Sequence, residues 1–323
     1  MIINTGQRTD IPAFYSEWFM NRIREGYVMV RNPFYPEQVT KYRLDPEVVD
    51  MLAFCTKNPG PMLPHLDEIS CFRQFWFVTI TAYGRDIEEN VPPKERVMEA
   101  FKRVSEKVGP KAMSWRYDPI FISEKYPLDF HIDQFEKMAA ELDGYTDQVV
   151  VSFIDMYEKT KKNFPEARTV RRDEEEKLAE AIATIGAEHG MTIRGCYERQ
   201  ELSQFGWNMD GCMTKDVLED AVAGYEKTAW GSGALSGPGL DIPKKKWARP
   251  ECGCIMGNDV GAYNTCAHFC RYCYANYDKR AVRDNMRKHD PSSPLLIGHL
   301  LPGDRVTEAK QTSWINGQIS MGL

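Results

Sequence analysis

Three cysteines near the C-terminal end of the chain have a spacing suited to metal chemistry. Cys266, Cys270 and Cys273 follow the pattern C-x3-C-x2-C in a sequence of 323 residues. Iron–sulfur clusters are held by cysteine thiolates in closely spaced runs. Three thiolates are one fewer than a closed four-iron cluster requires. The spacing therefore predicts a [4Fe–4S] cluster with one open iron, where a reaction can take place.

A structural zinc site is the alternative for the same loop, because Zn²⁺ also binds closely spaced thiolates. Such a site needs a fourth ligand. His268 lies inside the loop and Cys254 lies shortly before it, so either residue could supply that ligand. We favour the open iron–sulfur site and keep zinc as the competing interpretation.

Four more cysteines could build a second site. Two of them form a C-x-C pair just before the loop, one ends a strand pattern, and one precedes a helix pattern: Cys252, Cys254, Cys196 and Cys212. Four thiolates could close an auxiliary [4Fe–4S] cluster for electron transfer or substrate binding. Zinc, or no shared metal, is the alternative. Cys55 and Cys71 are expected to be small buried hydrophobic residues.

The bulk composition describes an ordinary globular protein. The formal net charge is −6, with 27% charged and 42% hydrophobic residues. This balance gives no global reason to expect binding to nucleic acid or to an anionic membrane. The N-terminus has no signal-peptide pattern, and no apolar run approaches the roughly 18 residues of a membrane span. We expect a cytoplasmic protein whose nine cysteines stay reduced, which favours metal or catalysis over disulfides.

Apolar, β-rich runs alternate with amphipathic helical patterns through the first 225 residues, as in repeated β-α units around a parallel sheet. The strands are expected at 1–5, 27–31, 51–55, 75–83, 112–117, 149–154 and 191–196. Helical stripes are expected at 15–25, 97–108, 135–142, 178–185, 214–225 and 279–288.

These repeats predict an α/β fold with a partial or full (β/α) TIM-like barrel. An open doubly wound sheet is less favoured, because no Gly-x-Gly-x-x-Gly follows the first strand. The barrel body is expected at 1–228, a glycine-rich connector at 229–250, and a C-terminal Fe–S cluster segment with its tail at 251–323. The last segment is expected to pack on the barrel.

The run CAHFCRYC at 266–273 resembles the cluster loop of the radical S-adenosylmethionine superfamily, including the aromatic residue before the last cysteine. The runs RTDIPA at 8–13, WRYDP at 115–119 and YNTC at 263–266 are similar to a bacterial family, domain of unknown function 1848. That family is known for a C-terminal cysteine cluster. The late position departs from the superfamily pattern, and no Gly-Gly-Glu-like segment follows to bind the methionine amino group.

The resemblance implies a partial or full (β/α) barrel and S-adenosylmethionine on the open iron of a cluster held by Cys266, Cys270 and Cys273. The active site of a (β/α) barrel lies at the carboxyl ends of its strands, so polar residues just after each strand are candidate site residues. The residues that meet this condition include Arg8, Asp10, Lys57, Asn58, Arg116, Asp118, Asp155 and Glu198.

Roles can be assigned to four of these residues. Arg116 is expected to bind a carboxylate of the cofactor, and Asp118 an amine or hydroxyl group. Asp155 could bind such groups too and is a candidate catalytic residue. Lys57 is expected to contact substrate or stabilise charge. Each residue has a structural alternative, such as an Arg–Asp ion pair at the barrel mouth or, for Asp10, a helix cap.

The predicted function is that of a radical S-adenosylmethionine enzyme. It would reductively cleave its cofactor to a 5′-deoxyadenosyl radical that acts on an organic substrate. A reducing protein such as flavodoxin or ferredoxin would supply the electron. No membrane partner is expected, and nucleic acid is disfavoured by the acidic charge. The alternative is a non-catalytic iron–sulfur or zinc protein that transfers electrons or binds a macromolecule.

Overall fold

The computed structural model describes residues 1–156, 158–230, 239–243, 247–249, 252–255 and 257–316. The strands are β1 (Ile2–Asn4), β2 (Tyr27–Arg31), β3 (Gln38–Arg43), β4 (Met51–Thr56), β5 (Gln74–Thr79), β6 (Met113–Ile120), β7 (Gln148–Phe153), β8 (Thr192–Gly195), β9 (Trp247–Arg249), β10 (Cys252–Ile255), β11 (Asn258–Asp259) and β12 (Arg305–Glu308). The α-helices are α1 (Ile11–Phe14), α2 (Ser16–Glu25), α3 (Lys94–Val108), α4 (Leu128–Leu142), α5 (Glu158–Asn163), α6 (Arg172–Glu188), α7 (Lys215–Trp230) and α8 (Lys279–Met286). Short 3-10 helices are η1 (Gly60–His65), η2 (Pro110–Ala112) and η3 (Gln200–Phe205).

The main sheet has seven strands in the order β11-β1-β4-β5-β6-β7-β8, and every neighbouring pair is parallel. Six of the predicted strands form it. The predicted strand at 27–31 does not: β2 pairs antiparallel with β3 in a separate three-stranded sheet. The seventh place is taken by β11, which comes from the segment between the C-x-C pair and the cluster loop.

The prediction was a partial or full barrel, and the main sheet is not closed in the described part of the chain, so these strands do not form a full barrel. Its edges are β8 and β11. The segment after β8 lies along the β8 edge, where Asn208 donates its N–H to the carbonyl of Ile193 (2.8 Å). Gly253 in turn donates to the carbonyl of Asp210 (3.0 Å). The segments 208–213 and 252–255 therefore run alongside the open side of the sheet.

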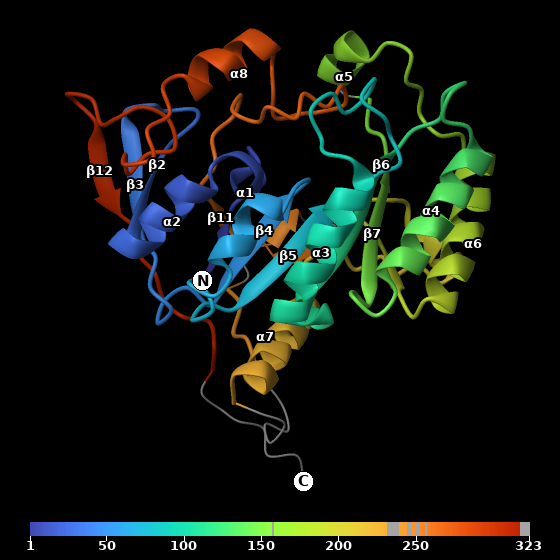
Figure 1. Ribbon diagram of the computed structural model, residues 1–323, viewed down its shortest axis with the longest axis horizontal. Coiled ribbons are helices and arrows are strands. Elements are labelled where there is room, and N and C mark those ends of the chain that lie inside the picture. The colour runs from blue at the N-terminus through green and yellow to red at the C-terminus, as the bar shows by residue number, and fades with distance from the viewer. Residues whose placement is uncertain (157, 231–238, 244–246, 250–251, 256, 317–323) are drawn as a thin grey trace.

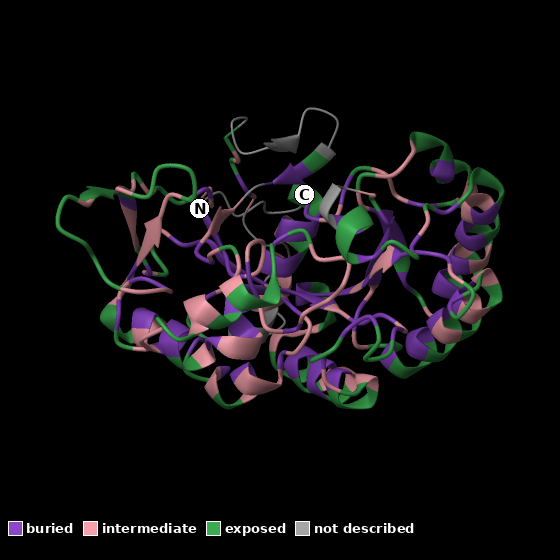
Figure 2. Ribbon diagram, turned by 90° about the horizontal axis from the view of Figure 1, so that it is seen from above, coloured by how far each residue is buried: buried purple, intermediate pink, exposed green. Residues whose placement is uncertain are grey.

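Helices α3, α4 and α6 lie side by side on one face of the main sheet, and α7 lies below α3 in the view of Figure 1. In α3, Val97, Phe101 and Val104 recur at helical spacing and are buried. Trp115 of β6 stacks on Phe135 of α4, with ring centroids 4.7 Å apart. Figure 2 shows the result: buried residues concentrate on the strands, and exposed residues lie on the outward sides of the helices.

The C-terminal tail returns to the first part of the chain. Strand β12 pairs in parallel with β3 in the small sheet. Trp314 is 5% exposed, and its backbone N–H donates to Asp50 (2.8 Å), which also pairs with the N-terminal amine of Met1. The predicted connector falls partly on residues 231–238 and 244–246, which lie outside the described residues.

Candidate metal and cofactor site

A cavity of about 460 Å³ lies where the carboxyl ends of β1, β4, β5, β6 and β7 meet. The last residues of these strands reach it, including Asn4, Thr56, Thr79 and Phe153. The segment after β8 and the cluster loop close its sides. All four strand-end residues assigned roles from the sequence line the cavity: Lys57, Arg116, Asp118 and Asp155.

The cluster loop, residues 266–273, places Cys266, Cys270 and Cys273 in the cavity wall. Its first part is fixed by three buried or half-buried hydrogen bonds. Tyr15 donates its hydroxyl to the carbonyl of Thr265 (2.6 Å), and Asn276 donates to the carbonyl of Cys266 (2.8 Å). The Thr265 hydroxyl reaches that of Thr9 (2.7 Å). The loop is therefore anchored to residues at the start of the chain.

His268 in the same loop joins a second anchor. Its Nε2 lies 2.9 Å from Asp10 Oδ2, and both side chains are buried. Asp10 also accepts the N–H of Ala13 as the cap of α1 and the N–H of Lys57 (2.8 Å). Asp10 therefore caps a helix, as its structural alternative predicted, and it also contacts His268 of the cluster loop. The next residue, Phe269, has φ = 54°, a left-handed conformation that is rare for a non-glycine residue.

Burial raises the pKa of Cys266 and Cys270 well above the ordinary value of a thiol. For Cys266, the nearby Asp10 adds to this effect, whereas for Cys270 the ammonium group of Lys57 opposes it. Without a metal ion, these thiols are therefore held in the neutral form. Metal ligands must lose the proton, so binding a metal here would release protons from the loop.

A second group of thiols lines the same cavity. Sγ of Cys212 lies 3.9 Å from that of Cys196 and 3.5 Å from that of Cys254. The hydrogen bond between Cys196 and Cys212 lowers the pKa of Cys196, whereas the hydrogen bonds of Cys212 with Cys196 and Cys254 raise the pKa of Cys212. Cys252 lies in β10, but its side chain is outside the described part of the structure.

In the part of the chain that the structure describes, no three His, Cys, Asp or Glu side chains are grouped as ligands around one metal ion. The thiols of the second group contact one another instead. The predicted metal ligands whose side chains are described share the lining of one cavity: Cys266, Cys270, Cys273, Cys196, Cys212 and Cys254.

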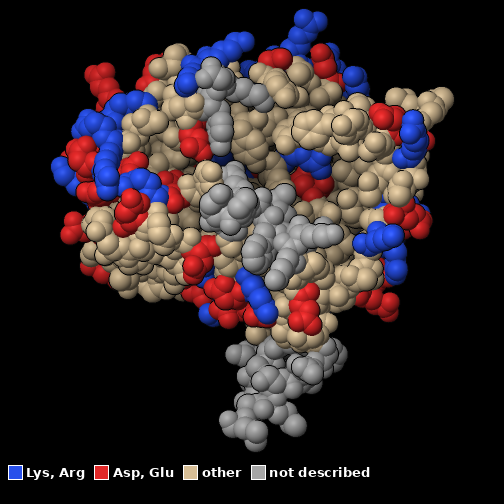
Figure 3. Space-filling model, turned by 180° about the vertical axis from the view of Figure 1, so that it is seen from behind, with Lys and Arg blue, Asp and Glu red and all other residues tan. Residues whose placement is uncertain are grey.

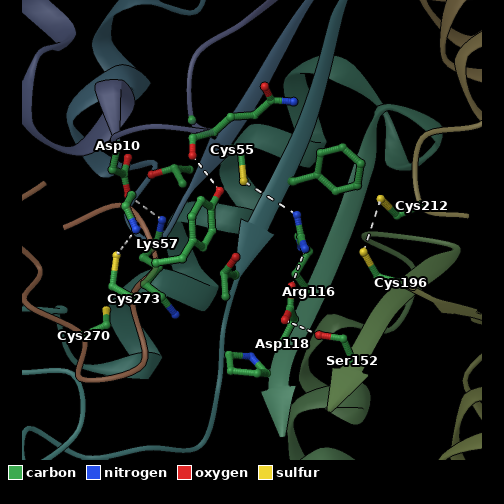
Figure 4. Close-up of a pocket in the computed structure, with 18 of the residues that line it drawn as sticks. Asp10, Cys55, Lys57, Arg116, Asp118, Ser152, Cys196, Cys212, Cys270 and Cys273 are labelled. Atoms are coloured by element: carbon green, nitrogen blue, oxygen red, sulfur yellow. Dashed lines mark hydrogen bonds and ion pairs between the residues drawn. The ribbon is translucent and has the colours of Figure 1, made fainter. Parts of the chain in front are cut away.

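Arg116 stands between the two thiol groups. Figure 4 shows Cys270 and Cys273 on one side of it and Cys196 and Cys212 on the other. Its guanidinium pairs with Asp118, which also accepts the hydroxyl of Ser152. Burial would lower the pKa of Arg116, but Asp118 raises it well above the ordinary value. An Arg–Asp ion pair, the structural alternative to cofactor binding, is therefore present, and the buried Nε of Arg116 has no hydrogen-bond partner among the described residues.

A buried carboxylate beside the cluster loop was not found from the sequence. Glu88 is 1% exposed and pairs with Lys57 (2.8 Å) and with Lys94. Burial would raise the pKa of Glu88, but the two ammonium groups lower it to about 2. Burial would likewise lower the pKa of Lys57, yet Glu88 raises it. Lys57, predicted to contact substrate, is thus tied into an ion-pair cluster at the cavity wall.

The remaining predictions have mixed outcomes. Asp155 lines the cavity and is exposed. The prediction that Cys71 is buried is wrong, because it is exposed in the turn between η1 and β5. Cys55 is half-buried at the cavity, where a guanidinium nitrogen of Arg116 lies 4.0 Å from its sulfur. Arg8 forms an ion pair with Asp259 of β11 (2.8 Å), outside the group of cavity residues.

Two findings bear on partners. Among the described residues, every helix is too short or too polar to cross a membrane. On the face seen in Figure 3, basic and acidic side chains are interspersed rather than gathered into one basic region. The run Lys244-Lys245-Lys246 lies outside the described residues.

A family model described as Domain of unknown function (DUF1848) matches residues 2–275. The match covers the whole main sheet and all three cysteines of the cluster loop. A comparison with curated proteins found no match.

Proposed function

The chain belongs to this family of unknown function, and from its cavity we propose that it is a radical S-adenosylmethionine enzyme acting on an organic substrate. One observation carries the proposal: Cys266, Cys270 and Cys273 line the same cavity as the charged residues at the strand ends. The donor set fits a [4Fe–4S] cluster, since three thiols come from one short loop that is held at its start and its middle.

When bound, the cluster and S-adenosylmethionine supply one-electron cleavage of the cofactor to a 5′-deoxyadenosyl radical, which is chemistry that no side chain can provide. The protein supplies position and shields the site from water. Residues of β1, β4, β5, β6 and β7 line the cavity, so a bound cofactor would be partly removed from solvent.

Arg116 and Asp118 are proposed to bind the cofactor. The guanidinium is held by Asp118, and its buried Nε is free of hydrogen bonds within the described residues, so it could donate to a carboxylate. Asp118 could accept from an amine or hydroxyl group. Asp155, at the exposed end of the cavity, is proposed as a catalytic group that contacts the substrate. Lys57 is proposed to stabilise negative charge near Cys270, to which it is electrostatically coupled.

We further propose that the main sheet is an incomplete (β/α) barrel. Its strands follow one another in order from β1 to β8, apart from β2 and β3. The segments 208–213 and 252–255 lie along the open side. These segments carry Cys212 and Cys254, so the second thiol group lies at the open side of the sheet. In this proposal, the cluster segment reaches the barrel from its open side.

Cys196, Cys212, Cys252 and Cys254 are proposed to form a second metal centre. An auxiliary [4Fe–4S] cluster would separate the thiolates, because each binds a different iron. Ligands that share one zinc ion lie closer, about 3.8 Å apart for Zn–S bonds of about 2.3 Å in a tetrahedron. The observed sulfur distances of 3.5 and 3.9 Å match the second pattern. A single zinc ion is therefore kept as an alternative for this centre.

The enzyme is proposed to act in the reducing cytoplasm, with flavodoxin or ferredoxin as electron donor. The competing proposal is a non-catalytic iron–sulfur or zinc protein that transfers electrons or binds a macromolecule. One anaerobic experiment separates the two. The protein is reconstituted with iron and sulfide, reduced, mixed with S-adenosylmethionine and assayed for 5′-deoxyadenosine. We expect product, and none from a verified [4Fe–4S] sample supplied with candidate substrates would contradict the enzyme.

Two variants assign the metals. Cys270→Ala should abolish the EPR signal that responds to S-adenosylmethionine, because it removes a ligand of the loop cluster. Cys254→Ala should keep that signal and lower the content of iron, for an auxiliary cluster, or of zinc, for a single ion. Metal analysis and EPR of both variants give the answer. Unchanged metal and signal in both would rule out both sites.

A further inference from the structure

Glu88 is the centre of a group of buried polar side chains next to the cluster loop. Its carboxylate accepts hydrogen bonds from four side chains: Lys57 (2.8 Å), Thr81 (2.6 Å), Lys94 and the hydroxyl of Tyr272. Tyr272 lies between Cys270 and Cys273 in the loop itself. A buried carboxylate is stable only if its lone pairs are satisfied, and here each donor comes from a different part of the chain.

The backbone beside Glu88 also pairs with the loop. Glu88 and Cys270 form an antiparallel bridge. Arg271 donates its N–H to the carbonyl of Ile87 (3.0 Å), and Asn90 donates its N–H to the carbonyl of His268 (3.0 Å). Residues 87–90 therefore run along the loop from His268 to Arg271. The position of Glu88, and of the cations it binds, is fixed relative to Cys270.

The group of side chains around Glu88 has an excess of positive charge. It holds two ammonium groups, Lys57 and Lys94, and one carboxylate, so its net charge is +1. The lysine side chains are 13% and 18% exposed, and screening by solvent is correspondingly weak. The ammonium of Lys57 also lies 5.5 Å from the centre of the Tyr272 ring. Both lysines interact electrostatically with Cys270.

We propose that Glu88 is a positioning residue that fixes Lys57 and Lys94 beside Cys270, and that their net positive charge raises the reduction potential of the cluster held by the loop. This inference rests on the proposed function, because it needs the cluster.

The physical reason is the change in charge on reduction. One electron from a low-potential donor makes the cluster more negative, and no bond is formed or broken. Nearby positive charge stabilises the reduced form more than the oxidised form, and cluster potentials depend on charge and hydrogen bonds around the sulfurs. The effect is large at a site with little solvent, where Coulomb interactions are stronger than in water.

The test is a redox titration of the reconstituted full chain, followed by the EPR signal that responds to S-adenosylmethionine. In Lys57→Met and Lys94→Met, the ratio of reduced to oxidised cluster at a fixed potential should fall about tenfold, or about 59 mV for one electron. Lys94→Arg keeps the charge and should restore the wild-type ratio. Lys102→Met is the matched control, because Lys102 lies on the same helix and pairs with the exposed Glu141.

Glu88→Gln should move the potential in the opposite direction, because it leaves two cations without their carboxylate. A purely structural role would move all three variants the same way. The inference would be overturned if all three variants shifted the reduction potential in the same direction, or if none shifted it at wild-type iron content. The proposed function would remain intact in either case. If one lysine variant loses its iron, the other still reports the potential. Wild-type protein that takes up no iron would overturn the proposed function, and this inference with it.

Discussion

Close contacts between single residues set the dimensions of the cavity. Gly6 follows β1 and lines the cavity beside Cys55 of β4. A Cβ atom added to Gly6 would lie 2.0 Å from the carbonyl oxygen of Cys55 and 2.6 Å from its Cβ. Only glycine allows the two strand ends to approach so closely. The positions of Cys55 and of the Arg116 guanidinium beside it therefore depend on Gly6 having no side chain.

Gly6→Ala should lower the free energy of unfolding by about 2–3 kcal/mol, because backbone must move to make room. Denaturant unfolding measures the change. Gly224→Ala is the control: it lies in α7, and its added Cβ would have only an ordinary contact at 3.4 Å. That variant should be as stable as wild type or more stable by about 0.5–1 kcal/mol. Equal destabilisation of both variants would contradict the close-contact argument.

Connections between elements depend on buried polar contacts as well as on the apolar core. His131 of α4 is fully buried, and its two ring nitrogens lie 3.0 Å from the Tyr117 hydroxyl and 2.9 Å from the Phe121 carbonyl. Both partners belong to β6 or the chain just after it. Burial lowers the pKa of His131 to about 4. The neutral ring thus joins α4 to the strand that carries Arg116 and Asp118.

This contact makes stability depend on pH. Between pH 6.5 and pH 4, the unfolded chain binds a proton at His131 and the folded chain does not, so stability is lost as the pH falls through this range. From pH 7 to pH 4.5, wild type should lose about 2 kcal/mol more unfolding free energy than His131→Gln. Urea unfolding of both proteins at several pH values measures the difference. Parallel pH profiles would show that His131 is not responsible.

At the scale of the whole molecule, residues 313 and 314 contact the N-terminal part of the chain through Asp50. The carboxylate of Asp50 pairs with the N-terminal amine and accepts from the backbone of Trp314 and the hydroxyl of Ser313 (2.5 Å). Strand β11 adds to β1 at the other side of the same N-terminal strand. The segment that carries the cluster loop is therefore bounded by two attachments to the first 50 residues.

Trp314→Ala should destabilise the fold by about 3–5 kcal/mol, because it empties a buried site of aromatic size. The variant should lower the melting temperature while its folded fraction keeps the same metal content as wild type after reconstitution, because the cluster loop lies elsewhere. Leu301→Ala is a suitable control, since Leu301 is 63% exposed. Thermal unfolding and metal content of the folded protein check both points. A stable Trp314→Ala protein would show that the tail is not part of the core.

The sequence by itself predicted six of the seven strands of the main sheet, and it placed Lys57, Arg116, Asp118 and Asp155 at the strand ends that line the cavity with the cluster loop. Each leaves a local pattern, because buried parallel strands are continuous apolar runs and ligand loops need short spacing. Pairing is not local. The strand at 27–31 has the same pattern as its neighbours, yet it pairs in the opposite direction in another sheet.

Only the tertiary structure decided which side chains meet. Glu88 lies in a loop without periodicity, and its partners come from residues 57, 81, 94 and 272. The open sheet, with β11 in the place expected for another strand, depends on contacts between residues about 250 positions apart. The physical reason is that burial of one segment follows from its own composition, whereas an ion pair or a strand neighbour depends on what the rest of the chain brings to it.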